Sequence, residues 1–221
     1  MCKQVVVFDL DDTLYKEIDY LKSAYREIAS LVYPVLKADY KDEDTVYHWM
    51  MENYQQGRNV FDELLHYPLP YEKQELLRIY REHKPAISLS EEAVEVLEAL
   101  KKEGYVLGLI TDGRSLTQRN KIEALGLDKY IESSLILISE ETGFCKPSLE
   151  GYQYVMTLYP GASYVYVGDN PQKDFYGPNQ LGWMTICLKN DGRNIHPQEE
   201  AEEAYRAQVS IENLKEIIKY L

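Results

Sequence analysis

The sequence predicts an α/β protein built on a doubly wound parallel sheet, with an all-helical segment inserted after the first strand. From residue 88 onward, short apolar runs alternate with helical patterns, which is typical of parallel strands joined by helices. Residues 16–87, in contrast, show helical patterns only. We therefore expect two domains, a core at residues 1–15 and 88–221 and a helical cap at residues 16–87.

The predicted strands begin with Gln4–Phe8, a β-branched run that ends at Asp9. Continuous apolar runs of this kind are typical of strands that are covered on both faces. Further strands are expected at residues 105–110, 135–138, 164–167 and Met184–Leu188, with a weaker edge strand at 207–209.

Helices are expected between these strands, and residues 90–103 give the clearest pattern. Ser90 can cap the amino end of this helix, and Gly104 is placed to end it. Residues 189–206 are polar and poorly patterned, so we expect a loop followed by a weak helix there. The other core helices are expected at residues 116–125, 149–158 and 211–221.

The helical insert is expected to contain four helices. Pro34 should kink or break the first of them, because proline removes a backbone donor and its ring clashes with the preceding turn. The four helices are expected at residues 17–38, 42–55, 59–66 and 71–83.

Composition and charge limit the classes of partner. Hydrophobic residues make up 45% and charged residues 28% of the 221 residues, as in an ordinary globular protein. The formal net charge of −13 would repel a nucleic acid polymer. A small anionic substrate would also need local cations, backbone N–H groups or a metal ion.

The three cysteines, Cys2, Cys145 and Cys187, are widely spaced and form no Cys-x-x-Cys pair. This spacing predicts neither a disulfide framework nor a zinc site. The sequence has no pattern of a signal peptide and no apolar stretch near the ~20 residues that span a bilayer. We therefore expect a cytoplasmic protein with no membrane partner, and the sequence predicts no oligomeric state.

Four polar motifs lie where a doubly wound sheet binds its ligands, at the carboxyl ends of strands and before a helix. Each carries carboxylate, hydroxyl or ammonium groups. In chain order they are Asp9-Leu10-Asp11-Asp12-Thr13, Thr111-Asp112-Gly113, Lys146-Pro147 and Gly168-Asp169-Asn170-Pro171-Gln172-Lys173-Asp174.

The acidic motifs predict phosphoryl transfer, which needs a nucleophile, neutralisation of charge and a proton for the leaving oxygen. Asp9, at the tip of its strand, would be the nucleophile and form an aspartyl phosphate. Asp11 would act as general acid for the leaving alcohol and then as general base for water. Converging carboxylates would repel one another and the substrate, so we expect a bound Mg²⁺ to bridge them to the phosphate.

The other motifs predict donors for the phosphate oxygens. Thr111 offers a hydroxyl, and Asp112 and Gly113 offer backbone N–H groups near the start of a helix. Lys146 offers an ammonium group. Thr13 is expected to brace the loop after the first strand rather than to contact substrate.

Taken together, the four motifs and their order resemble the haloacid dehalogenase superfamily of phosphohydrolases, over residues 1–15 and about 88–190. The insert resembles the first cap type of that superfamily. The resemblance implies a Rossmann-like catalytic core that binds Mg²⁺ through the Asp9 carboxylate, the Asp11 carbonyl and the Asp169 carboxylate. It leaves open whether Asp174 helps directly, through water or by holding Lys146.

We therefore predict a phosphatase that acts on a small phosphorylated metabolite, whose identity the cap does not reveal. A haloacid dehalogenase would have no alkoxide to protonate, and family dehalogenases lack an acid at the position of Asp11. A phosphomutase uses the same groups, so the core motifs do not exclude it. A receiver-type phospho-acceptor module would carry its phosphorylated aspartate after the third strand. A binding protein without turnover is also possible, but no motif position is substituted.

Overall fold

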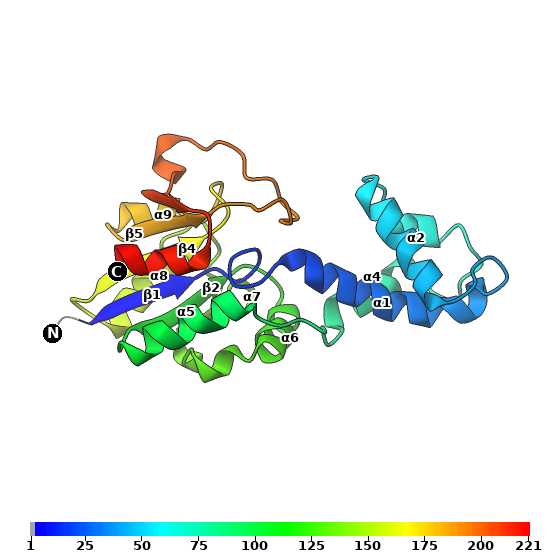
Figure 1. Ribbon diagram of the computed structural model, residues 1–221, viewed down its shortest axis with the longest axis horizontal. Coiled ribbons are helices and arrows are strands. Elements are labelled where there is room, and N and C mark those ends of the chain that lie inside the picture. The colour runs from blue at the N-terminus through cyan, green and yellow to red at the C-terminus, as the bar shows by residue number, and fades with distance from the viewer. Residues whose placement is uncertain (1–2) are drawn as a thin grey trace. The chain divides into compact units, whose positions relative to one another are not determined.

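The computed structural model describes residues 3–221 and contains a six-stranded parallel sheet, with helices on its faces (Figure 1). The strand order is β3-β2-β1-β4-β5-β6, which confirms the predicted doubly wound α/β fold. Cys2 lies outside the described residues. The strands are β1 (Gln4–Phe8), β2 (Val106–Thr111), β3 (Ile136–Ile138), β4 (Ser163–Gly168), β5 (Met184–Leu188) and β6 (Val209–Ile211).

The strand order places a topological switch between β1 and β4. The chain passes from β1 to β2 and β3 on one side of the sheet, and it builds β4, β5 and β6 on the other side. Val5, Val6 and Val7 of β1 are completely buried, as the apolar run predicts for a central strand. Doubly wound sheets bind ligands outside the carboxyl ends of strands at such a switch.

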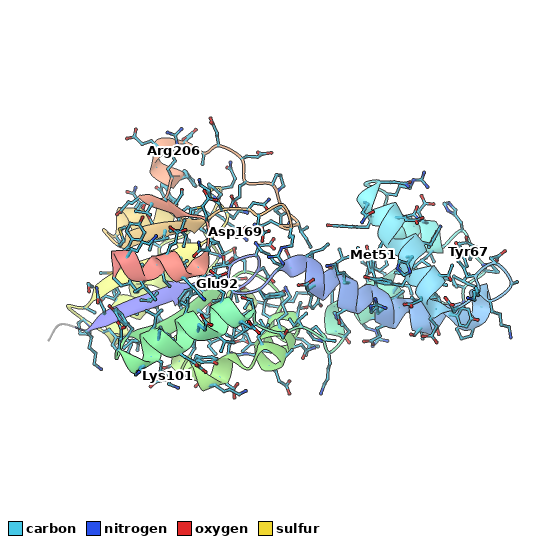
Figure 2. All side chains as sticks on the ribbon, in the orientation of Figure 1. Met51, Tyr67, Glu92, Lys101, Asp169 and Arg206 are labelled. Carbon is cyan, nitrogen blue, oxygen red and sulfur yellow. The ribbon has the colours of Figure 1, made fainter. Side chains whose placement is uncertain are left out.

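Residues with known capping preferences lie at the ends of two core helices. The Ser90 hydroxyl accepts a hydrogen bond from the Ala93 amide at 3.1 Å and caps α5, along which Figure 2 labels Glu92 and Lys101. Gly126 ends α6 in a left-handed conformation with φ 62°. The helices are α5 (Glu91–Lys102), α6 (Ser115–Leu125), α7 (Ser139–Thr142), α8 (Glu150–Leu158) and α9 (Tyr176–Gln180), with 3-10 turns η1 (Leu127–Lys129), η2 (Ser133–Leu135), η3 (Glu203–Tyr205) and η4 (Leu214–Tyr220).

The carboxyl-terminal elements differ from the prediction. The edge strand lies at Val209–Ile211 rather than 207–209, because Ile211 pairs with Leu188 of β5. The predicted α-helix at 211–221 is wrong, since a 3-10 helix begins only at Leu214. The weak helix expected before residue 206 is reduced to the single turn η3.

The chain divides into two compact units, residues 1–17 with 88–221, and residues 18–87. The second unit is helical and contains most of α1 (Glu17–Leu36) together with three further helices. Pro34, expected to kink or break this helix, does not break it, because α1 runs through this residue and ends two residues later at Leu36. Among residues 3–221, no helix has the length and apolarity to cross a membrane. The three further helices are α2 (Glu43–Gln55), α3 (Val60–Leu64) and α4 (Lys73–Glu82).

Tyrosine side chains form much of the core of the helical unit. The ring of Tyr25 packs edge-on against Phe61, with centroids 6.4 Å apart, and Phe61 packs edge-on against Tyr80 at 5.8 Å. The Tyr20 hydroxyl donates to the Tyr80 carbonyl at 2.7 Å. Such rings bury a large apolar area, and a hydroxyl such as that of Tyr20 can keep a polar partner, so these tyrosines stabilise the unit itself.

Candidate active site

The strand ends at the topological switch bring two aspartates together. Asp9 directly follows β1, and Asp169 directly follows β4, where Figure 2 labels it. The Asp9 amide donates to the Val167 carbonyl at 2.8 Å, which continues the pairing of the two strands into the site. Both carboxylates are buried, so rigid sheet backbone fixes their positions.

Lys146 joins two of the acidic motifs through a buried ion-pair network. Its Nζ donates to Asp9 Oδ1 at 2.5 Å and to Asp174 Oδ1 at 2.8 Å. Burial favours the neutral amine, but the carboxylates of Asp174 and Asp9 raise the pKa of Lys146 well above its usual value. The lysine is therefore a permanent positive charge beside Asp9.

Asp174 holds both Lys146 and the loop after β4. Its Oδ2 accepts hydrogen bonds from the backbone amides of Asp169, at 3.2 Å, and Asn170, at 2.8 Å. The sequence left open how Asp174 contributes, and the structure shows it bonded to Lys146. Gly168 makes this arrangement possible, because a Cβ there would lie 2.5 Å from Asp174 Oδ2.

We expect Gly168→Ala to lower the free energy of unfolding by roughly 1–3 kcal/mol, because the added methyl group must displace buried Asp174. Denaturant titration measures this change. Gly151→Ala is the matched control: its Cβ would meet no atom closer than 3.7 Å. In helix α8 alanine should leave stability unchanged or raise it by up to about 1 kcal/mol. Equal stabilities of the two variants would contradict the steric role of Gly168.

Three carboxylates form the acidic cluster of the site. Asp9, Asp169 and Asp174 each offer a ligand oxygen, and these atoms lie within 4.8 Å of one another. Burial raises the pKa of Asp9 to about 6 although Lys146 opposes it. Burial and the charges of Asp9 and Asp174 raise the pKa of Asp169 to about 8. This excess of buried negative charge and oxygen ligands fits a hard divalent cation.

Asp11 lies apart from this cluster, and three side chains hold its carboxylate. Lys121 Nζ donates to Oδ1 at 2.7 Å, and the Tyr15 hydroxyl donates to the same oxygen at 2.5 Å. Gln118 Nε2 donates to Oδ2 at 3.0 Å and to the Thr111 hydroxyl oxygen at 2.6 Å. Burial alone would raise the pKa of Asp11, but Lys121 and these hydrogen bonds lower it below its usual value.

Sequence reasoning did not single out Gln118 or Lys121. Both lie on the inward face of α6, whose buried residues are Gln118, Lys121, Ile122 and Leu125. Positions separated by three and four residues normally form the apolar stripe of such a helix. Two polar residues within that stripe are the signal that could have identified them.

The residues after β2 are arranged differently from the predicted anion site. The Thr111 side chain is buried, and its hydroxyl accepts from Gln118 rather than from another motif residue. The Gly113 amide, expected to donate to phosphate, donates instead to the Ser139 hydroxyl at 2.9 Å. The Asp112 carboxylate accepts from the Lys146 backbone amide at 3.2 Å, so it helps to fix the backbone that carries the lysine.

Asp12, rather than Thr13, has the hydrogen bonds that brace the loop after β1. The Thr13 hydroxyl is buried and has no hydrogen-bond partner within residues 3–221. Asp12 adopts φ 59°, a left-handed conformation that aspartate tolerates better than most residues. Its carboxylate accepts from the amides of Glu17, at 3.0 Å, and Ile195, at 3.1 Å.

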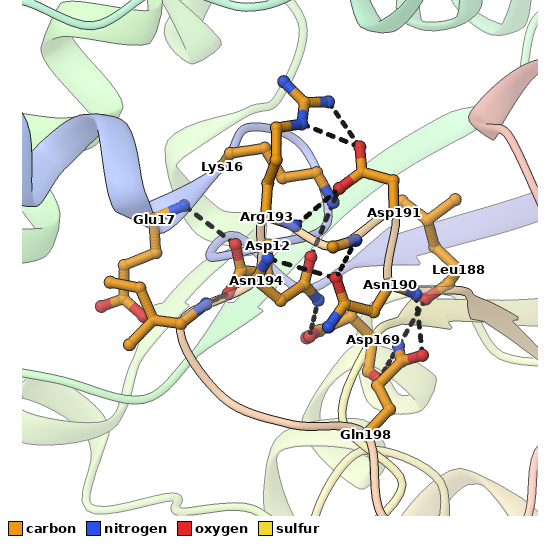
Figure 3. A network of polar contacts seen from close by, with 12 residues as sticks. Asp12, Lys16, Glu17, Asp169, Leu188, Asn190, Asp191, Arg193, Asn194 and Gln198 are labelled. Carbon is orange, nitrogen blue, oxygen red and sulfur yellow. Dashed lines mark hydrogen bonds and ion pairs between the residues drawn. The ribbon is translucent and has the colours of Figure 1, made fainter. Parts of the chain in front are cut away.

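Residues 189–198, which we call the strap, bind the loop that carries Asp169 (Figure 3). Asn194 Nδ2 donates to Asp169 Oδ2 at 2.8 Å, and Gln198 Nε2 donates to the Asp169 carbonyl at 2.6 Å. Lys16 Nζ donates to Asn194 Oδ1 at 2.7 Å. The sequence pattern predicted only a polar loop here, so Asn194 and Gln198 were missed.

Comparison with known families identifies this set of motifs. The family model described as haloacid dehalogenase-like hydrolase matches residues 6–187, a range that includes all four motifs. The chain belongs to this family. The predicted resemblance is therefore confirmed, as is the prediction, at the level of the family, of an enzyme that hydrolyses phosphate monoesters.

Several curated proteins are similar to this chain over most of its length. Glyceraldehyde 3-phosphate phosphatase from Methanocaldococcus jannaschii is 28% identical over 98% of this chain and 97% of the relative. The enzyme of the same name from Pyrococcus abyssi is 31% identical over 84% of this chain and 81% of the relative. The magnesium-bound HAD-hydrolase YfnB from Bacillus subtilis has the same fold, with 22% identity, a TM-score of 0.65 and coverage of 100% and 99%.

Proposed function

We propose that this chain is a Mg²⁺-dependent phosphatase that hydrolyses a small phosphate monoester through an aspartyl phosphate on Asp9. The observation that carries the proposal is the buried pairing of Asp9 with Lys146 inside a cluster of carboxylates. A nucleophilic carboxylate, a fixed cation for phosphate oxygens and oxygen ligands for a metal ion are the parts that phosphoryl transfer requires.

In the first step, the Asp9 carboxylate attacks phosphorus, and the bond between phosphorus and the leaving oxygen breaks. Asp11 acts here in its protonated form and gives its proton to that oxygen, so that the product leaves as a neutral alcohol and Asp11 becomes the carboxylate that its three donors hold. The Lys146 ammonium binds the transferring group. The Thr111 hydroxyl accepts from Gln118, so its own proton remains available to a phosphate oxygen.

In the second step, Asp11 takes a proton from water, and the water oxygen attacks the phosphorus of the aspartyl phosphate. The bond between phosphorus and Asp9 breaks, which releases inorganic phosphate and restores both aspartates. Asp9, the Asp11 carbonyl and Asp169 would hold Mg²⁺, and Asp174 would support the site. When bound, this ion would neutralise the carboxylates and the charge that develops on the phosphoryl group.

Asp11 supports ester hydrolysis over dehalogenation. Its carboxylate is held by three donors beside Thr111, and a reaction without an alkoxide leaving group would not need that acid. A phosphomutase remains the nearest rival, because it uses the same groups. We also propose that the helical unit selects the substrate as a cap, and two relatives named glyceraldehyde 3-phosphate phosphatase support a small phosphorylated metabolite.

The proposal is tested by phosphate release from a panel of small phosphomonoesters in the presence of Mg²⁺. The panel contains glyceraldehyde 3-phosphate, phosphoserine, nucleoside monophosphates and sugar phosphates. We expect release from at least one of them, and the best substrate defines the specificity. Absence of release across the panel, with transfer of phosphate between sugar positions, would instead identify a mutase.

A further inference from the structure

Helix α6 contributes two side chains that end on the carboxylate of Asp11. Lys121 binds Oδ1 and Gln118 binds Oδ2, while Tyr15 from the loop after β1 also binds Oδ1. Donors on both oxygens restrict rotation of the carboxylate plane as well as its position. A carboxylate on a loop without such donors would sample several orientations.

Lys121 is buried deeply for a lysine, with its side chain 3% exposed. Its ammonium lies 2.7 Å from Asp11 Oδ1, while the carboxylate of Glu17 is 3.7 Å away. Burying an ammonium group costs free energy unless a carboxylate compensates it. The closest compensating carboxylate is that of Asp11. The lysine ammonium is therefore buried at a cost in free energy, and its main partner is this aspartate.

Gln118 connects the proton donor to the phosphate-binding residue. Its amide nitrogen carries two N–H groups, and it lies 2.6 Å from the Thr111 hydroxyl oxygen and 3.0 Å from Asp11 Oδ2. One side chain therefore fixes the spacing between Thr111 and Asp11. Gly113 permits this approach, because a Cβ there would lie 3.0 Å from the Gln118 side chain.

We infer that Lys121 and Gln118 are positioning residues that orient Asp11 for proton transfer to the leaving oxygen. This inference rests on the proposed function and deepens it. Neither side chain needs to contact the substrate, since both act through Asp11. The core helix α6 would then set the geometry of the acid, independently of the residues that select the substrate.

The inference predicts a dependence on the leaving group that a purely structural role would not give. Protonation matters when the leaving oxygen is a basic alkoxide and matters little for a weakly basic nitrophenolate. Removing a positioned acid typically costs 10²–10⁴ in rate. The ratio kcat/KM reports only steps up to departure of the leaving group, so slow hydrolysis of the aspartyl phosphate does not obscure the comparison.

The experiment measures kcat/KM of the full chain with Mg²⁺ for 4-nitrophenyl phosphate and for the alkyl phosphate that the wild type hydrolyses best. We expect Lys121→Met to lower the value for the alkyl ester about 100-fold and to change the value for the nitrophenyl ester much less. Lys121→Arg should recover part of the loss, and Asp11→Asn should show the same selectivity as Lys121→Met. Lys102→Met, at an exposed position of α5, is the matched control and should leave both values unchanged.

If Lys121→Met fails to fold, Gln118→Leu provides a second variant. It replaces the polar glutamine with an apolar side chain that suits its buried position on α6. Equal losses on both esters, or no loss on either, would overturn the positioning role while leaving the proposed function intact. Failure of the wild type to hydrolyse either ester would overturn the proposed function and this inference with it.

Discussion

Asp9→Asn is expected to reduce phosphate release by more than about a thousandfold, because a neutral amide cannot serve as the nucleophile that forms the aspartyl phosphate. The substitution keeps the shape of the side chain, and Lys146 keeps its ion pair with Asp174. Phosphate release under saturating Mg²⁺ measures the effect. Mass spectrometry of rapidly quenched reactions should detect a phosphorylated wild-type chain and no phosphorylated variant.

The same variant should fold normally, and its stability should depend less on pH. Burial raises the pKa of Asp9 to about 6 from an ordinary value of 3.8, so the folded wild type binds a proton more tightly than the unfolded chain. Ionised Asp9 therefore destabilises the metal-free fold as pH rises from about 4 through 6, and asparagine removes this effect. Asp128→Asn, at an exposed position, is the control. A variant of Asp9 that keeps a tenth of the activity would refute the nucleophile assignment.

Removal of Mg²⁺ by a chelator is expected to abolish turnover, and excess Mg²⁺ should restore it. With its carboxylates ionised, the free site contains three neighbouring negative charges and one lysine ammonium bonded to two of them. A dianionic phosphate would meet net repulsion there unless a metal ion compensated the charge. Activity that persists in chelator would contradict the metal site.

Binding of Mg²⁺ should also strengthen between pH 6 and pH 8, independently of turnover. The pKa of Asp9 is raised to about 6 and that of Asp169 to about 8 in the metal-free site, mainly by burial. The ion needs ionised carboxylates, so it must displace protons at low pH and fewer of them at high pH. Calorimetric titration at both pH values measures the change. Asp169→Asn should lose most of the binding, while Asp128→Asn should keep it.

The fold and the four motifs could be predicted because they depend on local patterns. The apolar run of β1, the Ser90 cap and Gly126 each act within a few residues of their position, and the strand ends then locate Asp9, Thr111 and Asp169. The parallel topology follows from the alternation of strands and helices. Local patterns therefore place the groups that carry the chemistry.

The supporting residues could not be predicted, because their roles depend on contacts between distant segments. Lys121 resembles any helix lysine until Asp11, 110 positions earlier, is placed beside it. Asn194 lies in a strap without periodicity, and its contact with Asp169 spans 25 positions. The Gly113 amide, predicted to donate to phosphate, donates in this structure to the Ser139 hydroxyl at the start of α7, 26 positions later.

The strap has a consequence for the order in which the site is completed during synthesis. Asp12 leaves the ribosome early, but one of its two backbone partners, the Ile195 amide, is made 183 residues later. Asn194 and Gln198 follow Asp169 by 25 and 29 residues. A nascent chain that ends at residue 188 therefore carries all four motifs but lacks the strap residues that bind Asp169 and the second backbone partner of Asp12. Proteins are synthesised from the amino end, so the acidic cluster reaches its final geometry only after the strap has been made.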